Sequence, residues 1–234
     1  AVAVERPFEV DARAVLDGLG REGAAVDRLA SLLLEEPFAS ETEGLSGWKA
    51  KLRRLYWGFG MDALPVNGRV FLPEGSGPEG DGPFPLALMV HGNHNMLDFS
   101  DDGYGWLGEH LASHGIVFVS VDQNFLNGAP FIGGVPTEND ARGWLLLEHL
   151  AALERFEETP GNPLSGRLDL SRIALMGHSR GGEAAAVAAA FDQLARYPDD
   201  ATGELPGPFG VDAVVAFAPA DGQYRPAGQR TPLA

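Results

Sequence analysis

The pattern of apolar and polar positions changes near residue 85. Downstream of that point, short continuous apolar runs alternate with longer helical segments. Apolar runs of this length predict strands that are buried on both faces of a sheet. The predicted strands are residues 85–90, 116–121, 173–176 and 211–218. The predicted helices are residues 103–114, 137–157 and 180–195. This alternation indicates an α/β protein with a mostly parallel sheet, helices on both faces and right-handed crossovers.

The first part of the chain has a weaker pattern. Leucines and valines at helical spacing predict one or two short helices within residues 11–36, although several glycines interrupt them. Residues 37–47 have the composition of a linker. We therefore expect residues 1–47 to form an N-terminal helical segment and linker that precedes the α/β core.

An antiparallel hairpin is expected at the start of the core, which we place at residues 48–234. The segment Lys51–Phe59 is rich in aromatic residues and alternates loosely, which is typical of a strand. Asn67-Gly68 is a turn signal, and residues 69–72 then predict the second arm of the hairpin.

Composition narrows the class of protein and its partners. Hydrophobic residues make up 44% of the chain and charged residues 21%, which is typical of a globular domain. The 17 Lys and Arg against 33 Asp and Glu leave a net charge of −16. Such an acidic surface repels phosphate backbones, so we expect no nucleic-acid partner.

The sequence lacks two features, cysteine and long apolar runs, and this excludes further kinds of site and segment. The chain has no cysteine, which excludes disulfides, zinc–thiolate sites and a cysteine nucleophile. No apolar run reaches the roughly 18 residues that span a bilayer, so we expect no transmembrane segment. The sequence begins at Ala1, and both a cleaved signal peptide and an excised segment fit this start. We expect a secreted or cell-envelope protein rather than a cytoplasmic one.

The strongest chemical signal is the run GHSRGG at residues 177–182. It follows a predicted buried strand and precedes a predicted helix, which is the context of a nucleophile elbow. Gly177 and Gly181 leave room for a tight turn that exposes the hydroxyl of Ser179 at the carboxyl end of the sheet. The competing interpretation is a glycine-rich turn whose serine only caps the helix.

A second signal is the run HGNH at residues 91–94, directly after the first strand of the core. In an elbow enzyme, the oxyanion hole combines the amide after the nucleophile with an amide from such a loop. We therefore expect the backbone amides of Arg180 and Asn93 to be its donors. A metal site at His91 and His94 is the alternative, but no third ligand is evident, so we expect no metal.

These motifs resemble the α/β-hydrolase superfamily, and the likeness covers roughly residues 48–220. Within it, the chain is most similar to dienelactone hydrolases, cutinase-like polyester hydrolases and chlorophyllase-like enzymes, and the last share the elbow at residues 177–182. The resemblance implies hydrolysis of carboxylic esters through an acyl-enzyme on Ser179, without a cofactor. The expected partner is a small-molecule or polymeric ester.

The general base has no candidate in the expected place. In this superfamily the chain order is Ser, then Asp or Glu, then His, but all six histidines precede Ser179. Either the last strands, with the acid and the histidine, lie beyond residue 234, or the fold is a degenerate, non-catalytic one. We favour the first, in which a C-terminal segment of the same protein completes the site and this chain alone is inactive. Asp221, at the end of the last predicted strand, is a fallback acid.

Side chains near the carboxyl ends of the strands are candidates for binding substrate, because ligands bind at that edge of a parallel sheet. The candidates are His94, Tyr104, Phe125 and Phe131. Aromatic residues at these positions are equally typical of a core. Two other functions stay open: a non-catalytic binding module, and a serine peptidase or acyltransferase with the same elbow.

Overall fold

The computed structural model describes most of the chain from residue 47 onward and one earlier strand. The described ranges are residues 47–61, 63–73, 82–128, 134–135 and 138–224, with the backbone of residues 26–29. The strands are β1 (Val26–Leu29), β2 (Gly68–Pro73), β3 (Phe84–Val90), β4 (Val117–Val121), β5 (Leu168–His178) and β6 (Ala213–Phe217). The helices are α2 (Gly47–Trp57), α3 (Gly105–Ala112), α4 (Asn139–Glu158) and α5 (Arg180–Phe191), with 3-10 turns η1 (Ser100–Tyr104) and η2 (Asn124–Leu126).

The strands form one six-stranded sheet in the order β1-β2-β4-β3-β5-β6. β4, β3, β5 and β6 run parallel to one another, whereas β2 is antiparallel to both β4 and β1. The four parallel strands are those that the apolar runs predicted. The expected mostly parallel sheet is therefore confirmed.

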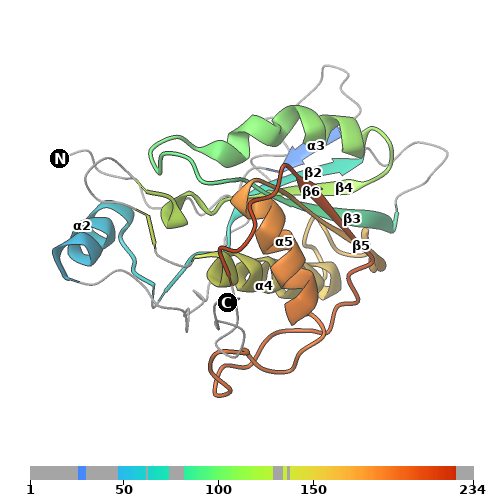
Figure 1. Ribbon diagram of the computed structural model, residues 1–234. Helices are drawn as coiled ribbons and strands as arrows, with labels where there is room; N and C mark the ends of the chain where they lie inside the picture. The colour runs from blue at the N-terminus through green and yellow to red at the C-terminus, as the bar shows by residue number, and fades with distance from the viewer. Residues whose placement is uncertain are drawn as a thin grey trace.

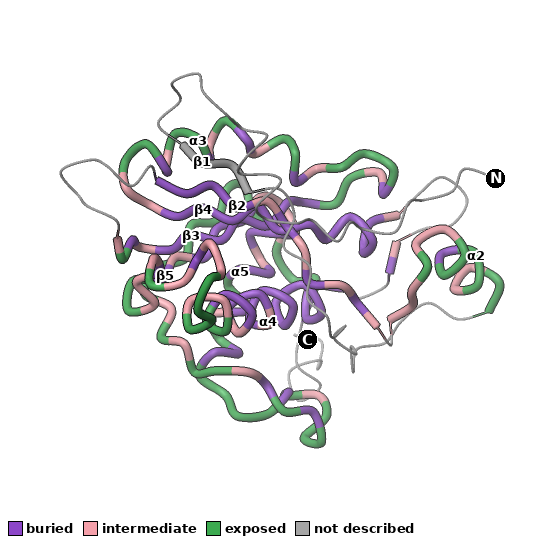
Figure 2. The backbone as a smooth tube through the Cα atoms, turned by 180° about the vertical axis from the view of Figure 1, so that it is seen from behind, coloured by how far each residue is buried: buried purple, intermediate pink, exposed green. Residues whose placement is uncertain are grey.

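Helices cover both faces of this sheet. Figure 1 shows α3 on one side and α4 with α5 on the other. Alternate residues of β3 face opposite layers: Leu86 and Leu88 pack with the side chains of α4 and α5, whereas Ala87 and Met89 pack below α3. Figure 2 shows the central strands and much of α4 as buried. This two-sided burial explains why β3, β4 and the second half of β5 appear in the sequence as continuous apolar runs.

β6 differs from the other parallel strands. In the described part of the chain it pairs only with β5, so it forms one edge of the sheet. All five of its residues are exposed although all are apolar, and Phe217 is 44% exposed.

The N-terminal predictions were wrong in two places. Lys51–Phe59, predicted to be a strand, lies mostly in helix α2. Its Lys, Leu and Arg residues favour helix, and Arg53 with Trp57 forms an inward-facing (i, i+4) pair that the strand interpretation overlooked. Residues 26–29, within a predicted helix, form β1 because their backbone pairs with β2.

An antiparallel pair does precede the parallel strands, as predicted, but its first strand is β1 rather than the segment at Lys51–Phe59. The rest of the predicted helical region, residues 11–25 and 30–36, lies outside the described residues, as does the linker up to residue 46. No helix in the described part of the chain is long and apolar enough to span a bilayer.

Candidate active site

The elbow at Ser179 has the geometry that the motif predicts. Ser179 joins β5 to α5 with φ 55° and ψ −121°, a backbone conformation that is costly for any residue except glycine. Four backbone hydrogen bonds hold it: the Ser179 amide donates to the carbonyl of Phe217 at 3.0 Å, and its carbonyl accepts from the amides of Gly182 at 3.0 Å, Glu183 at 3.4 Å and Ala220 at 2.9 Å. The strained turn is thus fixed by α5 and by the segment around the end of β6.

The glycines of the elbow are required by close backbone contacts. A Cβ added at Gly177 would lie 2.0 Å from the carbonyl oxygen of Gly181. A Cβ at Gly181 would lie 2.4 Å from the carbonyl oxygen of Val90, at the end of β3. No side chain fits at either position, so α5 begins directly against β3 and β5.

The HGNH loop after β3 reaches the elbow. A Cβ added at Gly92 would lie 2.9 Å from the Cβ of Ser179 and 3.1 Å from the carbonyl oxygen of His178. Asn93 follows at an exposed position, and Ser179 itself is half-buried. Arg180 opens α5, where the first amides have no partner within the helix. The structure therefore brings Ser179, Arg180 and the loop of Asn93 together.

His91 anchors this loop from inside the protein. Its buried ring lies with Nδ1 2.8 Å from the carbonyl oxygen of Gly92 and with Nε2 3.1 Å from the amide of Gln123, which donates to it. Nδ1 must then carry the proton. Burial, together with the nearby charge of Arg142, lowers the pKa of His91 to about 3, so the ring stays neutral. Both ring nitrogens are occupied, and neither is open to a metal.

The other predicted partners lie around this centre. His94 is exposed, and its ring stacks on that of His178 with the centroids 6.3 Å apart. Asp221 is exposed and follows Ala220, whose amide bonds to Ser179. Within the described ranges, no histidine or carboxylate makes a hydrogen bond with the hydroxyl of Ser179.

Comparison with known proteins identifies the family. The family model described as Chlorophyllase matches residues 75–232, a range that covers more than half of the chain. The chain belongs to the chlorophyllase family. With the elbow between a parallel strand and a helix, membership confirms the α/β-hydrolase fold.

Individual relatives of this chlorophyllase-family chain share shorter stretches. Cutinase 2 of Thermobifida cellulosilytica is 38% identical over 77 residues, which are 33% of this chain and 25% of the relative. Bis(hydroxyethyl) terephthalate hydrolase of Streptomyces coelicolor is 33% identical over 102 residues, 44% of this chain and 27% of the relative. The chain thus spans about a quarter of the length of these curated relatives. A solved structure, bacterial heroin esterase, is 19% identical, with a TM-score of 0.43 over 83% of this chain and 46% of that one.

The predicted substrate-binding aromatic residues occupy different surroundings in this chlorophyllase-family chain. Tyr104 is partly buried and packs on the cluster of Phe71 and Met89 on the α3 side of the sheet. Phe125 is buried and lines a cavity of about 360 Å³ next to α2. Phe131 lies outside the described residues. Tyr104 and Phe125 therefore belong to different clusters, and Tyr104 does not line the cavity at Phe125.

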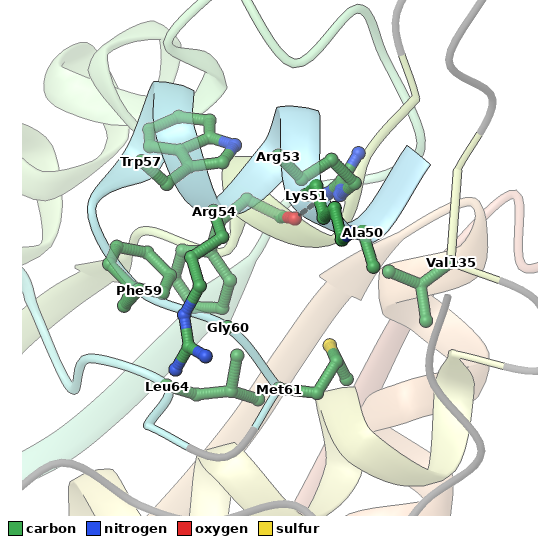
Figure 3. A pocket seen from close by; sticks show the side chains of 11 residues that line it. Ala50, Lys51, Arg53, Arg54, Trp57, Phe59, Gly60, Met61, Leu64 and Val135 are labelled. Atoms are coloured by element: carbon green, nitrogen blue, oxygen red, sulfur yellow. Dashed lines mark hydrogen bonds between the residues drawn. The ribbon is translucent and has the colours of Figure 1, made fainter. Parts of the chain in front are cut away.

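The cavity at Phe125 is mostly apolar, with three basic residues in its lining. Figure 3 shows Trp57, Phe59, Met61, Leu64 and Val135 around it. The rings of Phe59 and Phe125 meet edge to face, with their centroids 5.4 Å apart. Its basic lining residues, all from α2, are Lys51, Arg53 and Arg54. Such a lining suits an apolar group that carries a negative charge nearby.

Several residues that tie the site together were not among the predicted site residues. The carboxylate of Glu138, before α4, accepts a hydrogen bond from Arg180 at 2.8 Å. The carboxylate of Glu183, in the first turn of α5, accepts from the amide of Gln223 at 2.8 Å and so holds the segment after β6. An acidic residue four positions after the elbow serine, in the first helical turn, was the available hint for Glu183.

Proposed function

We propose that this chain carries the nucleophile of a serine carboxylic-ester hydrolase, and that Ser179 is that nucleophile. The observation that supports this most is the strained turn at Ser179, held at the start of α5 with Gly92 packed against it. Family membership and the names of the relatives, cutinase and bis(hydroxyethyl) terephthalate hydrolase, support an ester as the substrate.

In the proposed reaction, the Ser179 hydroxyl attacks the ester carbonyl while a base takes its proton. The negative charge that develops on the carbonyl oxygen is stabilised by the amides of Arg180 and Asn93. Each such donor is commonly worth about 3 kcal/mol. The alcohol leaves, and water releases the acid from the acyl-enzyme. The positive end of α5 adds to this stabilisation.

The general base and acid of this proposal lie beyond residue 234, in the order Ser, acid, His. The reason is the absence of any histidine after Ser179 in the sequence and of any described group bonded to its hydroxyl. Asp221 is the alternative acid, because it lies next to the residue that bonds the elbow.

The substrate would be a small-molecule or polymeric ester, and no cofactor takes part in this scheme. We place an apolar acyl or alcohol group in the cavity at Phe125. His94, Tyr104 and Phe131 do not belong to the described lining of this cavity, and we propose them as contacts to other parts of the substrate. The exposed lining residues Lys51 and Arg54 favour esters with an anionic group over cationic ones.

The test is labelling of the full-length protein by a fluorophosphonate, with the modified residue located by mass spectrometry. We expect label on Ser179, none in Ser179→Ala, and unchanged labelling in Ser171→Ala, a control that removes an exposed serine from the same strand. A stoichiometrically active full-length enzyme that is not labelled at Ser179 would contradict the proposal. Ester hydrolysis retained in Ser179→Ala would do the same.

Two further measurements separate the rival functions. The 234-residue chain alone is expected to turn over p-nitrophenyl esters negligibly, because it lacks the base; ordinary esterase rates from it would refute the placement of the base. Rates with matched ester, peptide and acyl-transfer substrates distinguish a hydrolase of esters from a peptidase or an acyltransferase. A binding module would keep its role in Ser179→Ala.

A further inference from the structure

A buried polar network connects the elbow to the start of α4. The Oε1 atom of Glu138 accepts hydrogen bonds from Arg180 Nη1 at 2.8 Å and from Arg142 Nε at 3.2 Å. Glu138 and Arg142 are 2% and 0% exposed, whereas the Arg180 side chain is 32% exposed. One oxygen of Glu138 thus binds both Arg180, which follows the proposed nucleophile, and the buried Arg142.

The same network continues to the loop on the other side of the nucleophile. Arg142 and Gln123 bond to each other twice: Arg142 Nη1 donates to Gln123 Oε1 at 3.4 Å, and Gln123 Nε2 donates to the Arg142 carbonyl at 3.1 Å. The Gln123 amide donates to His91 Nε2 at 3.1 Å, and His91 Nδ1 lies 2.8 Å from the carbonyl oxygen of Gly92. A continuous path therefore joins Arg180 to the residue before Asn93.

Stability alone is a poor explanation for these buried charges. Burial lowers the pKa of Arg142 because its cation is removed from water, with Glu138 acting in the opposite direction. Apolar residues of similar volume in place of such a buried pair are often neutral or stabilising. A hydrogen-bonded network fixes the orientation of the groups at its ends, whereas an apolar contact does not. Those ends are the two segments that carry the proposed oxyanion donors.

We propose that Glu138 and Arg142 are positioning residues that set the spacing of the two oxyanion donors, the amides of Arg180 and Asn93. Neither side chain contacts the reacting atoms; each acts through Arg180 on one side and through Gln123 and His91 on the other. This inference rests on the proposed function of Ser179. It adds that the distance between the two amides is fixed from α4, and not by the elbow turn alone.

The inference predicts a loss of rate without a loss of substrate binding. Oxyanion donors act on the transition state, and a misplacement of about 1 Å costs on the order of 100-fold in rate. Glu138→Ala removes the shared acceptor, so kcat should fall by about 100-fold while KM changes by less than about threefold. Glu138→Gln retains an oxygen acceptor at Oε1, and its amide takes the place of Oε2, which makes no hydrogen bond within the described ranges. It should keep kcat within about tenfold of wild type.

The experiment measures kcat, KM and the rate of fluorophosphonate labelling for these variants in the full-length protein. The matched control is Glu148→Gln: Glu148 is also on α4, but its hydrogen bond goes to Trp144 and not to the network. We expect the control to match wild type and Glu138→Ala to lose kcat and labelling rate together. A folded Glu138→Ala with wild-type kcat, or a loss confined to KM, would overturn the inference.

A second variant covers the case in which Glu138→Ala does not fold. Arg180→Met removes a side chain that is 32% exposed and leaves the buried pair of Glu138 and Arg142 intact. We expect at least about a tenfold fall in kcat at unchanged KM, because one donor segment loses its anchor; wild-type kcat there would refute the inference. Activity that survives in Ser179→Ala would instead refute the proposed function, so the two failures are distinguishable.

Discussion

Replacing Gly177 by alanine should disrupt the start of α5. The added Cβ would lie 2.0 Å from the carbonyl oxygen and 2.6 Å from the amide nitrogen on the far side of the elbow, at Gly181 and Gly182. Ordinary contacts begin at 3.4 Å, so one backbone segment must move by about 1.4 Å. No side chain can rotate to absorb this, because every close atom belongs to the main chain.

The expected cost follows from that geometry. Overpacking a well-packed site typically costs about 1–3 kcal/mol, and a clash between two backbone segments belongs at the upper end. We expect Gly177→Ala to lower the free energy of unfolding by about 3 kcal/mol. With a urea m-value of about 3 kcal/mol/M, the midpoint should fall by about 1 M. Fluorophosphonate labelling should slow as well, because the movement displaces the amide of Arg180 from Ser179.

Urea unfolding followed by tryptophan fluorescence is the assay, and Gly103→Ala is the control. A Cβ at Gly103 meets nothing within 4 Å, and its φ is not in the left-handed region. We expect the control to stay within about 0.5 kcal/mol of wild type. If Gly177→Ala also stays within that range, with normal labelling, then the close packing of α5 against β5 is wrong.

Three further predictions concern groups outside the elbow. Asp192→Asn should lower the free energy of unfolding in urea by about 2–3 kcal/mol, because the buried carboxylate accepts hydrogen bonds from the amides of residues 209–211, just before β6. An unchanged urea midpoint would contradict this. Arg142→Met should lower the free energy of unfolding by about 3 kcal/mol, because Glu138 loses one of its two cationic partners. A rise in stability would show that Arg180 alone compensates the buried charge of Glu138. Burial, followed by nearby carboxylates, raises the pKa of Asp101 to about 7. The folded state therefore retains a proton that the unfolded chain loses above about pH 4, and this group's contribution to stability falls between about pH 4 and 7. Asp101→Asn should flatten that slope, and an unaltered pH profile would refute the assignment.

The core of the fold was predictable because its central strands, β3 and β4, are buried on both faces. The sequence of β6 has the same apolar pattern, although its residues are exposed. β3, β4 and β6 coincide with apolar runs to within one or two residues. The predicted strand at residues 173–176 covers only part of β5, because the first half of β5 is less apolar. The elbow was predictable for a different reason. Its glycines are demanded by contacts within a few residues of Ser179, so the requirement is visible locally.

The N-terminal part was not predictable by the same means. β1 has four residues, and its place depends on pairing with the edge of β2, across a long sequence separation. The assignment of Lys51–Phe59 rested on aromatic content, although α2 has better helix formers and its inward side is set by one buried arginine. Such one-sided burial depends on tertiary partners, and a short stretch of sequence does not contain them.

The contacts around the site depend on the register of the strands, and this is why the sequence did not predict which residues meet there. The parallel pairing of Val90 with Gly177 in β3 and β5 brings Gly92 against Ser179, and the pairing of His178 with Phe217 brings the end of β6 to the elbow amide. A slip of one residue in either pairing would turn these contacts to the other face of the sheet. The strain at Ser179 is therefore sustained by two neighbouring strands at once, and we expect the elbow to form only after β3, β5 and β6 have paired.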